Sequence, residues 1–350
     1  GPLIAELVAH EVGHTLGLRH NFKASSVYSF DEMNGDEVKG KKPLAGSVMD
    51  YIPINLRADG KPQGDYTMIG IGPYDEWAIE YGYTLASDLK PILARVNEPE
   101  LVYGTDEETD GPDPRARRYD FTKEPLVYAN NQIELVKKHR EGLTDKFVKD
   151  GESWARARHG YELSLSLQLR SVSMMANWLG GAFTTRALKG DKDSTRPVEV
   201  VPVEQQKAAL KFVIENTFFD DSFGLTPDLL AHLSVDKWLD GGSSFSAFSS
   251  EATYPVHDTI MGIQASTLTM VMNTTTLRRI YDNELRLPAD QDALTLPEVL
   301  ESLTNAIWQE LEKAPNKQYT SRVPLVSSLR RNLQQEHLER LVDLSIPGDV

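Results

Sequence analysis

The chain has 350 residues, of which 40% are hydrophobic and 25% are charged, and this size and composition predict a globular protein of two domains rather than one. The formal net charge of −15 argues against nucleic acid as a partner, because such a surface repels a polyanion. No uncharged apolar stretch approaches the length of about 18 residues that a membrane span requires. Cysteine is absent, which excludes disulfides, thiolate chemistry and cysteine-bound metal.

The first predicted element is a helix over residues 3–16. Its apolar residues recur at steps of three and four, which is helical periodicity. They are Ile4, Leu7, Val8, Val12 and Leu16. Gly17 follows and is placed to end the helix in a left-handed turn, because glycine adopts positive φ without a steric penalty.

This helix carries the start of the motif HEVGHTLGLRH at residues 10–20. His10 and His14 are four residues apart, so their side chains leave the same helix face and can bind one metal ion. Glu11 lies beside His10, where its carboxylate can take a proton from a zinc-bound water and later give one to a leaving amine.

The rest of the motif predicts a catalytic rather than a structural metal site. The turn at Gly17 brings His20 round as a third ligand. Three protein ligands leave one coordination position open for a water of lowered pKa, which is the nucleophile in zinc hydrolysis. A chance match of all five motif positions is on the order of one in ten thousand or less, so ordinary surface or core histidines are the weaker interpretation.

Residues 23–72 are rich in Gly, Pro, Asp, Asn and Lys and show no sustained period. This predicts loops around the compact segment SVMDY at 47–51. The next segment, PYDEWAIEYGY at 73–83, predicts a short helix with Pro73 near its start and Gly82 at its end.

Residues 96–125 combine an acidic run, several prolines and the basic cluster RARRY, which predicts an exposed linker or excursion. Helical periodicity then dominates the rest of the chain. The predicted helices cover 152–179, 204–218, 256–286, 296–312 and 324–343. Thr295 and Glu298 form a capping box that opens the fourth of them. PVEVVPV at 197–203 is β-like, and its prolines limit it to an edge strand or a connector.

The motif at 10–20 and the segment at 47–51 together resemble the metzincin zinc metalloproteases, whose pattern is HExxHxxGxxH followed by a Met-turn. The resemblance implies one catalytic zinc ion (Zn2+) held by His10, His14 and His20, with Glu11 as the catalytic base. It assigns Met49 to a hydrophobic floor beneath the ligands. It also places Tyr51 near the metal, as an extra ligand or a stabiliser of the oxyanion; a buried tyrosine with a hydrogen-bonded hydroxyl is the open alternative.

The resemblance covers about residues 3–85, because 73–83 is similar to the helix that ends the metzincin catalytic domain. Asn21, directly after His20, departs from the Ser, Asp, Glu or Pro of the better-known metzincin branches. With its helical extension the chain looks most like large bacterial metzincins of uncharacterised-domain type, many of them exported. The resemblance therefore implies a periplasmic, outer-surface or extracellular protein.

We predict a mainly α fold in which the C-terminal half of a metzincin catalytic domain precedes a mostly α-helical domain. Residues 1–95 would form the partial catalytic domain, 96–125 the linker and 126–350 the helical accessory domain. Metzincins carry a twisted sheet before the active-site helix, and its edge strand pairs with the substrate. We therefore expect a C-terminal fragment that is inactive until the upstream part of the same protein completes the catalytic domain.

The predicted function is that of a zinc-dependent endopeptidase acting on protein or peptide substrates, with no nucleic acid partner and no membrane insertion. Two alternatives stay open. The chain could be a catalytically silent fragment that serves as a helical interaction or scaffold module. It could also be a zinc hydrolase that does not act on peptides.

Overall fold

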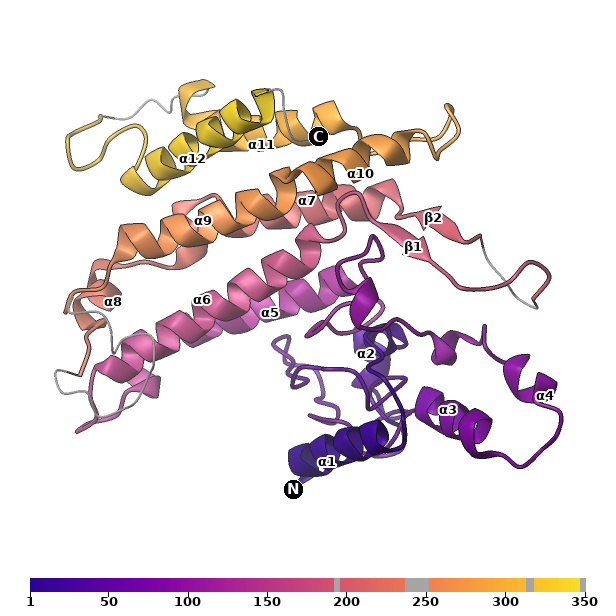
Figure 1. Ribbon diagram of the computed structural model, residues 1–350. Coiled ribbons are helices and arrows are strands. Elements are labelled where there is room, and N and C mark those ends of the chain that lie inside the picture. The colour runs from indigo at the N-terminus through magenta and orange to yellow at the C-terminus, as the bar shows by residue number, and fades with distance from the viewer. Residues whose placement is uncertain (192–195, 237–251, 313–317, 347–350) are drawn as a thin grey trace. The chain divides into compact units, whose positions relative to one another are not determined.

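The computed structural model describes the chain except for residues 192–195, 237–251, 313–317 and 347–350 (Figure 1). The described part is mainly helical, as predicted, and contains one small sheet. The chain divides into two compact units. Unit 1 comprises residues 1–131 and 180–205, and unit 2 comprises residues 132–179 and 206–350.

Unit 1 begins with helix α1 (Pro2–Thr15) and continues through loops with short helical turns. The further helical elements are η1 (Ala24–Ser26), α2 (Phe30–Met33), α3 (Pro73–Tyr83), α4 (Lys90–Leu93), η2 (Pro99–Leu101) and η3 (Asp106–Glu108). Strands β1 (Ala182–Thr184) and β2 (Val198–Val200) pair antiparallel, with Ala182 opposite Val200. The predicted β-like segment is therefore one strand of a two-stranded sheet.

The end of α1 follows the prediction made from Gly17. This residue has a φ of 89°, in the left-handed region. The amide of Gly17 donates to the carbonyl of His14, and the amide of Leu18 donates to the carbonyl of Gly13, both at 3.0 Å. These paired bonds form a Schellman motif, so the chain reverses direction directly after the helix.

Residues 96–125 pack within unit 1, which differs from the linker predicted for them. Their backbone pairs with the chain just beyond α1: the Phe22 amide donates to Gly104 O, and the Arg117 amide donates to Phe22 O. Buried side chains of this stretch include Leu101, Ala116 and Phe121. An acidic run with prolines looks like a linker in the sequence because its partners are distant in the chain and leave no local pattern.

Unit 2 is built of longer helices. In chain order its elements are the end of α5 (Pro125–Glu141), the π turn η4 (Leu143–Phe147), α6 (Ala155–Ala176), α7 (Val203–Thr217), η5 (Asp220–Phe223), α8 (Pro227–His232), α9 (Val256–Met272), α10 (Thr274–Glu284), α11 (Leu296–Glu312) and α12 (Ser328–Ser345). Helix α9 contacts both α6 and α12 (Figure 1). Tyr161, Leu165, Phe223 and Ile260 belong to the core beneath these helices.

Four of the predicted helices correspond to α6, α7, α11 and α12. The prediction of one helix over 256–286 is wrong, because Asn273 has an extended conformation and separates α9 from α10. The Asn273 side chain accepts a hydrogen bond from the Thr276 amide and so caps the second helix. Among the described helices, none is both long enough and apolar enough to cross a membrane.

Candidate active site

Three histidines from α1 and the turn after it lie close together. The candidate ligand atoms of His10, His14 and His20 are all within 4.8 Å of one another. His10 is buried, His20 is partly buried and His14 is exposed, so the cluster is accessible from solvent. In the part of the chain that the structure describes, no other three His, Cys, Asp or Glu side chains lie close enough to share a metal ion.

The two histidines on α1 are oriented by backbone carbonyls. Nδ1 of His10 lies 2.8 Å from Val48 O, and Nδ1 of His14 lies 3.0 Å from Leu18 O. A carbonyl only accepts hydrogen bonds, so each Nδ1 carries the proton and each Nε2 keeps its lone pair. Both rings are therefore held in the tautomer that binds a metal through Nε2.

The third histidine is oriented by a side-chain carboxylate. Nδ1 of His20 lies 3.1 and 3.0 Å from the two carboxylate oxygens of Asp106. Because Nδ1 donates to Asp106, Nε2 is the acceptor for the Tyr51 hydroxyl, which lies 2.8 Å away. The His20 ring also stacks on Phe22, with ring centroids 4.9 Å apart.

Met49 packs directly under α1 at Gly13. The methionine is fully buried, and a Cβ atom added to Gly13 would lie 2.4 Å from its sulfur. The Met49 carbonyl accepts a hydrogen bond from the amide of Asn21, the residue after His20. The segment SVMDY thus contacts the motif at Gly13 and is hydrogen-bonded to Asn21, the residue that follows the motif.

The match to a known protein family covers most of the chain. The family described as Met-zincin matches residues 1–315. The chain belongs to the Met-zincin family. This membership confirms the metzincin resemblance of the motif at 10–20. No curated protein and no solved structure matches the chain.

Burial and a carboxylate hold the SVMDY segment and His10 of this Met-zincin in place. Asp75, near the start of α3, accepts hydrogen bonds from the Ser47 hydroxyl and from the amides of Val48 and Gly72. Burial raises the pKa of Asp75, although these hydrogen bonds oppose the rise. Burial lowers the pKa of His10, against the opposing effect of its bond to Val48 O. His10 is therefore favoured as the neutral imidazole, the form that binds metals.

Glu11 and Tyr51 border the three histidines. Glu11 is exposed, and its charge acts on both His10 and Tyr51. Burial raises the pKa of Tyr51, and the neighbouring Tyr119 and Asp106 raise it further, so its hydroxyl stays protonated. The Tyr51 ring stacks on Tyr119, with centroids 6.1 Å apart.

The sequence motif does not reveal Asp106 or Arg118. Arg118 Nη2 donates to Asp106 Oδ1 at 3.1 Å. Burial raises the pKa of Asp106, but its hydrogen bonds with His20 and Arg118 outweigh this effect and lower the pKa. The only sequence sign of this arrangement is Asn21, whose departure from the common metzincin residue is explained by its contacts with this segment.

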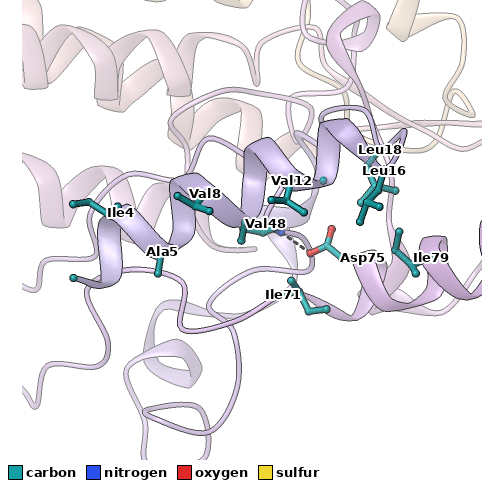
Figure 2. Close-up of a pocket in the computed structure, with 13 residues that line it drawn as sticks. Ile4, Ala5, Val8, Val12, Leu16, Leu18, Val48, Ile71, Asp75 and Ile79 are labelled. Atoms are coloured by element: carbon teal, nitrogen blue, oxygen red, sulfur yellow. Dashed lines mark hydrogen bonds between the residues drawn. The ribbon is translucent and has the colours of Figure 1, made fainter.

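A pocket of about 630 Å³ lies on a different face of α1 (Figure 2). Ile4, Val8 and Val12 of α1 line it, together with Ile71 and Ile79. His10 and His14 are not among the lining residues, because their positions on α1 point to another face. This apolar pocket is therefore separate from the histidine cluster.

Proposed function

We propose that this Met-zincin is a zinc-dependent endopeptidase, with one catalytic zinc ion held by His10, His14 and His20. The observation that carries the proposal is the common orientation of the three imidazoles. Each Nδ1 donates to an oxygen, so Nε2 is the unprotonated nitrogen of each ring and can bind a shared ion; Nε2 of His20, which accepts from the Tyr51 hydroxyl, would exchange that hydrogen bond for the metal. Membership of a metzincin family supports the same function and makes proteins or peptides the proposed substrates.

The donor set suits zinc. Zinc accepts neutral imidazole nitrogens, and its histidine ligands usually donate their other N–H to a carbonyl or carboxylate, as all three do here. Three protein ligands leave a position open, which is typical of catalytic rather than structural zinc. When bound, zinc supplies Lewis-acid chemistry that polarises a carbonyl and lowers the pKa of water.

Glu11 is the proposed proton carrier. Its carboxylate is exposed beside His10 and is near enough for its charge to act on His10 and Tyr51. A carboxylate in this position can take a proton from the attacking water and deliver it to the leaving amine.

Tyr51 is proposed to stabilise the oxyanion. Its hydroxyl lies at the edge of the cluster and donates to His20 Nε2 at 2.8 Å. Its raised pKa keeps the proton on the hydroxyl, so Tyr51 could donate to a substrate oxygen when His20 Nε2 is bound to the metal. A fixed donor at this edge strengthens as negative charge develops on the substrate oxygen. Met49, buried against Gly13, is proposed as the apolar floor that supports the helix carrying two of the ligands.

Glu11→Gln tests this assignment. We expect unchanged zinc content and a loss of peptide hydrolysis of at least about 100-fold, the usual contribution of general acid–base catalysis. The variant and its control are made in the full-length protein, which includes the predicted upstream part of the catalytic domain, and the measurements are zinc per chain and cleavage of denatured casein and of a peptide library. Glu76→Gln removes another exposed carboxylate, on α3, and should change neither quantity.

Three results would contradict the proposal. Full peptidase activity in Glu11→Gln would remove Glu11 from the mechanism. Zinc retained at wild-type affinity in His20→Ala would remove that ligand. A zinc-loaded protein that cleaves none of the peptides would instead support the non-peptidase hydrolase.

A further inference from the structure

The candidate metal site includes a carboxylate that lies 86 residues beyond His20 in the sequence. His10 and His14 are oriented by backbone carbonyls, which any residue type can supply. His20 differs, because its Nδ1 lies within 3.1 Å of both carboxylate oxygens of Asp106. Its orientation therefore depends on one particular side chain.

Asp106 is itself held from several directions. Arg118 Nη2 donates to Oδ1 at 3.1 Å, and Arg19 lies 3.9 Å from Oδ2. Asp106 begins the short turn η3, which is closed by a capping box between Thr105 and Glu108. The carboxylate is thus fixed in position by its turn and by two cations before any metal is considered.

Asn21 ties this segment to the histidine motif. Its side chain is fully buried, donates to Val102 O at 2.9 Å and accepts from the Gly104 amide at 3.1 Å. The amide of Asn21 donates in turn to Met49 O at 3.1 Å. Asn21, the residue directly after His20, therefore connects the Met-turn to the segment that carries Asp106.

We propose that Asp106 is a positioning residue of the metal centre, with Asn21 as the anchor that brings it to His20. This inference rests on the proposed zinc site. Asp106 accepts the Nδ1 proton of His20, which fixes the ring, leaves Nε2 as the unprotonated nitrogen that can exchange the Tyr51 hydroxyl for a metal, and raises the basicity of the imidazole. A carboxylate that only joined a surface ion pair with Arg19 and Arg118 would have no such effect on the metal.

Zinc affinity, measured by competition with a chromophoric chelator, tests this role. We expect Asp106→Ala to weaken zinc binding by about 10- to 100-fold, the usual effect of losing such a partner. Asp106→Asn keeps an acceptor oxygen without the charge and should lie between Asp106→Ala and the wild type. Glu107→Ala is the matched control, because Glu107 is the next residue, is exposed and pairs with Arg19 without contacting His20.

A second measurement does not depend on metal. The imidazole ¹⁵N shifts of His20 in zinc-free protein should report the Nδ1–H tautomer in the wild type and in Glu107→Ala. In Asp106→Ala they should move toward a mixture of tautomers. Thermal unfolding of Asp106→Asn should match that of the wild type. This result would show that a change at the His20 imidazole does not come from a loss of folded structure.

The outcomes are distinguishable. Wild-type protein that binds no zinc overturns the proposed function and this inference together. Wild-type protein that binds zinc, with Asp106→Ala and Asp106→Asn as tight as Glu107→Ala and with an unchanged His20 tautomer, overturns only the role of Asp106.

Discussion

At the scale of single residues, the site depends on close contacts that tolerate little change. Gly13 is the clearest case, because the sulfur of Met49 occupies the space that a side chain at position 13 would need. Met49 is fully buried, so its side chain would have to shift within the core to admit a Cβ atom at position 13. The glycine between the two α1 histidines therefore allows the SVMDY segment to approach the helix.

Gly13→Ala should be destabilising by about 1–3 kcal/mol, because overpacking forces the buried methionine out of its place. Gly82→Ala is the matched control: Gly82 also lies in a helix, α3, but nothing stands within 4 Å of an added Cβ. That variant should be stabilised by about 0.5–1 kcal/mol through helix propensity alone. Denaturant unfolding of the two proteins checks the difference, and equal stabilities would disprove the contact.

A buried carboxyl pair, Asp50 of the SVMDY segment and Asp120, predicts a pH effect on stability. The Ser25 amide donates to Asp50, and the Ser25 hydroxyl donates to Asp120. Burial raises the pKa of Asp120 to about 7. Between the unfolded pKa near 4 and this value, the folded state keeps a proton that the unfolded state has lost, so stability falls as pH rises through this range.

Asp120→Asn removes this titration while keeping an oxygen to accept the Ser25 hydroxyl. From pH 5 to pH 8 the free energy of unfolding of the wild type should fall relative to that of the variant. The expected fall is about 1.4 kcal/mol for each pH unit between the unfolded and the folded pKa of Asp120. Urea unfolding at a series of pH values measures this. If the free energy of unfolding changes with pH in the same way in both proteins, Asp120 is ionised over the whole range from pH 5 to pH 8.

At the scale of elements, local sequence rules predict the helices whose start and end depend on neighbouring residues in the chain. Helix α1 and its left-handed stop follow from apolar spacing and Gly17, and α11 follows from its Thr295 cap, which accepts from the Glu298 amide. The break between α9 and α10 is not predicted from apolar spacing, because apolar residues continue at helical steps on both sides of it; Asn273 and the three threonines after it are the local sign of a new helix start.

The stop of α1 yields a prediction of its own. Gly17→Ala places a Cβ in the left-handed region, which should lower stability by about 1–2 kcal/mol and weaken zinc binding, because His20 follows this turn. Gly60 has a similar φ of 75° and open space around it. Gly60→Ala should carry comparable strain and leave zinc affinity unchanged. Competition with a chelator measures the zinc affinity of both variants. Equal affinities would show that the turn at Gly17 does not affect the metal site.

At the scale of the whole molecule, the sequence predicts the metal-binding motif but not what surrounds it. His10, Glu11, His14 and His20 lie within eleven residues, so the helix and the turn at Gly17 that ends it bring them near one another. Asp106 reaches His20 only because residues 102–118 return to the motif, a tertiary contact with no local pattern. The same distance explains why residues 96–125 looked like a linker.

X-ray absorption at the zinc K edge of the zinc-loaded protein tests the proposed three-histidine site most directly. We expect one zinc per chain with nitrogen and oxygen ligands at about 2.0–2.1 Å and outer-shell scattering from three imidazoles, falling to two in His20→Ala. A protein without bound zinc, or an imidazole count that does not change in His20→Ala, would contradict the proposed site.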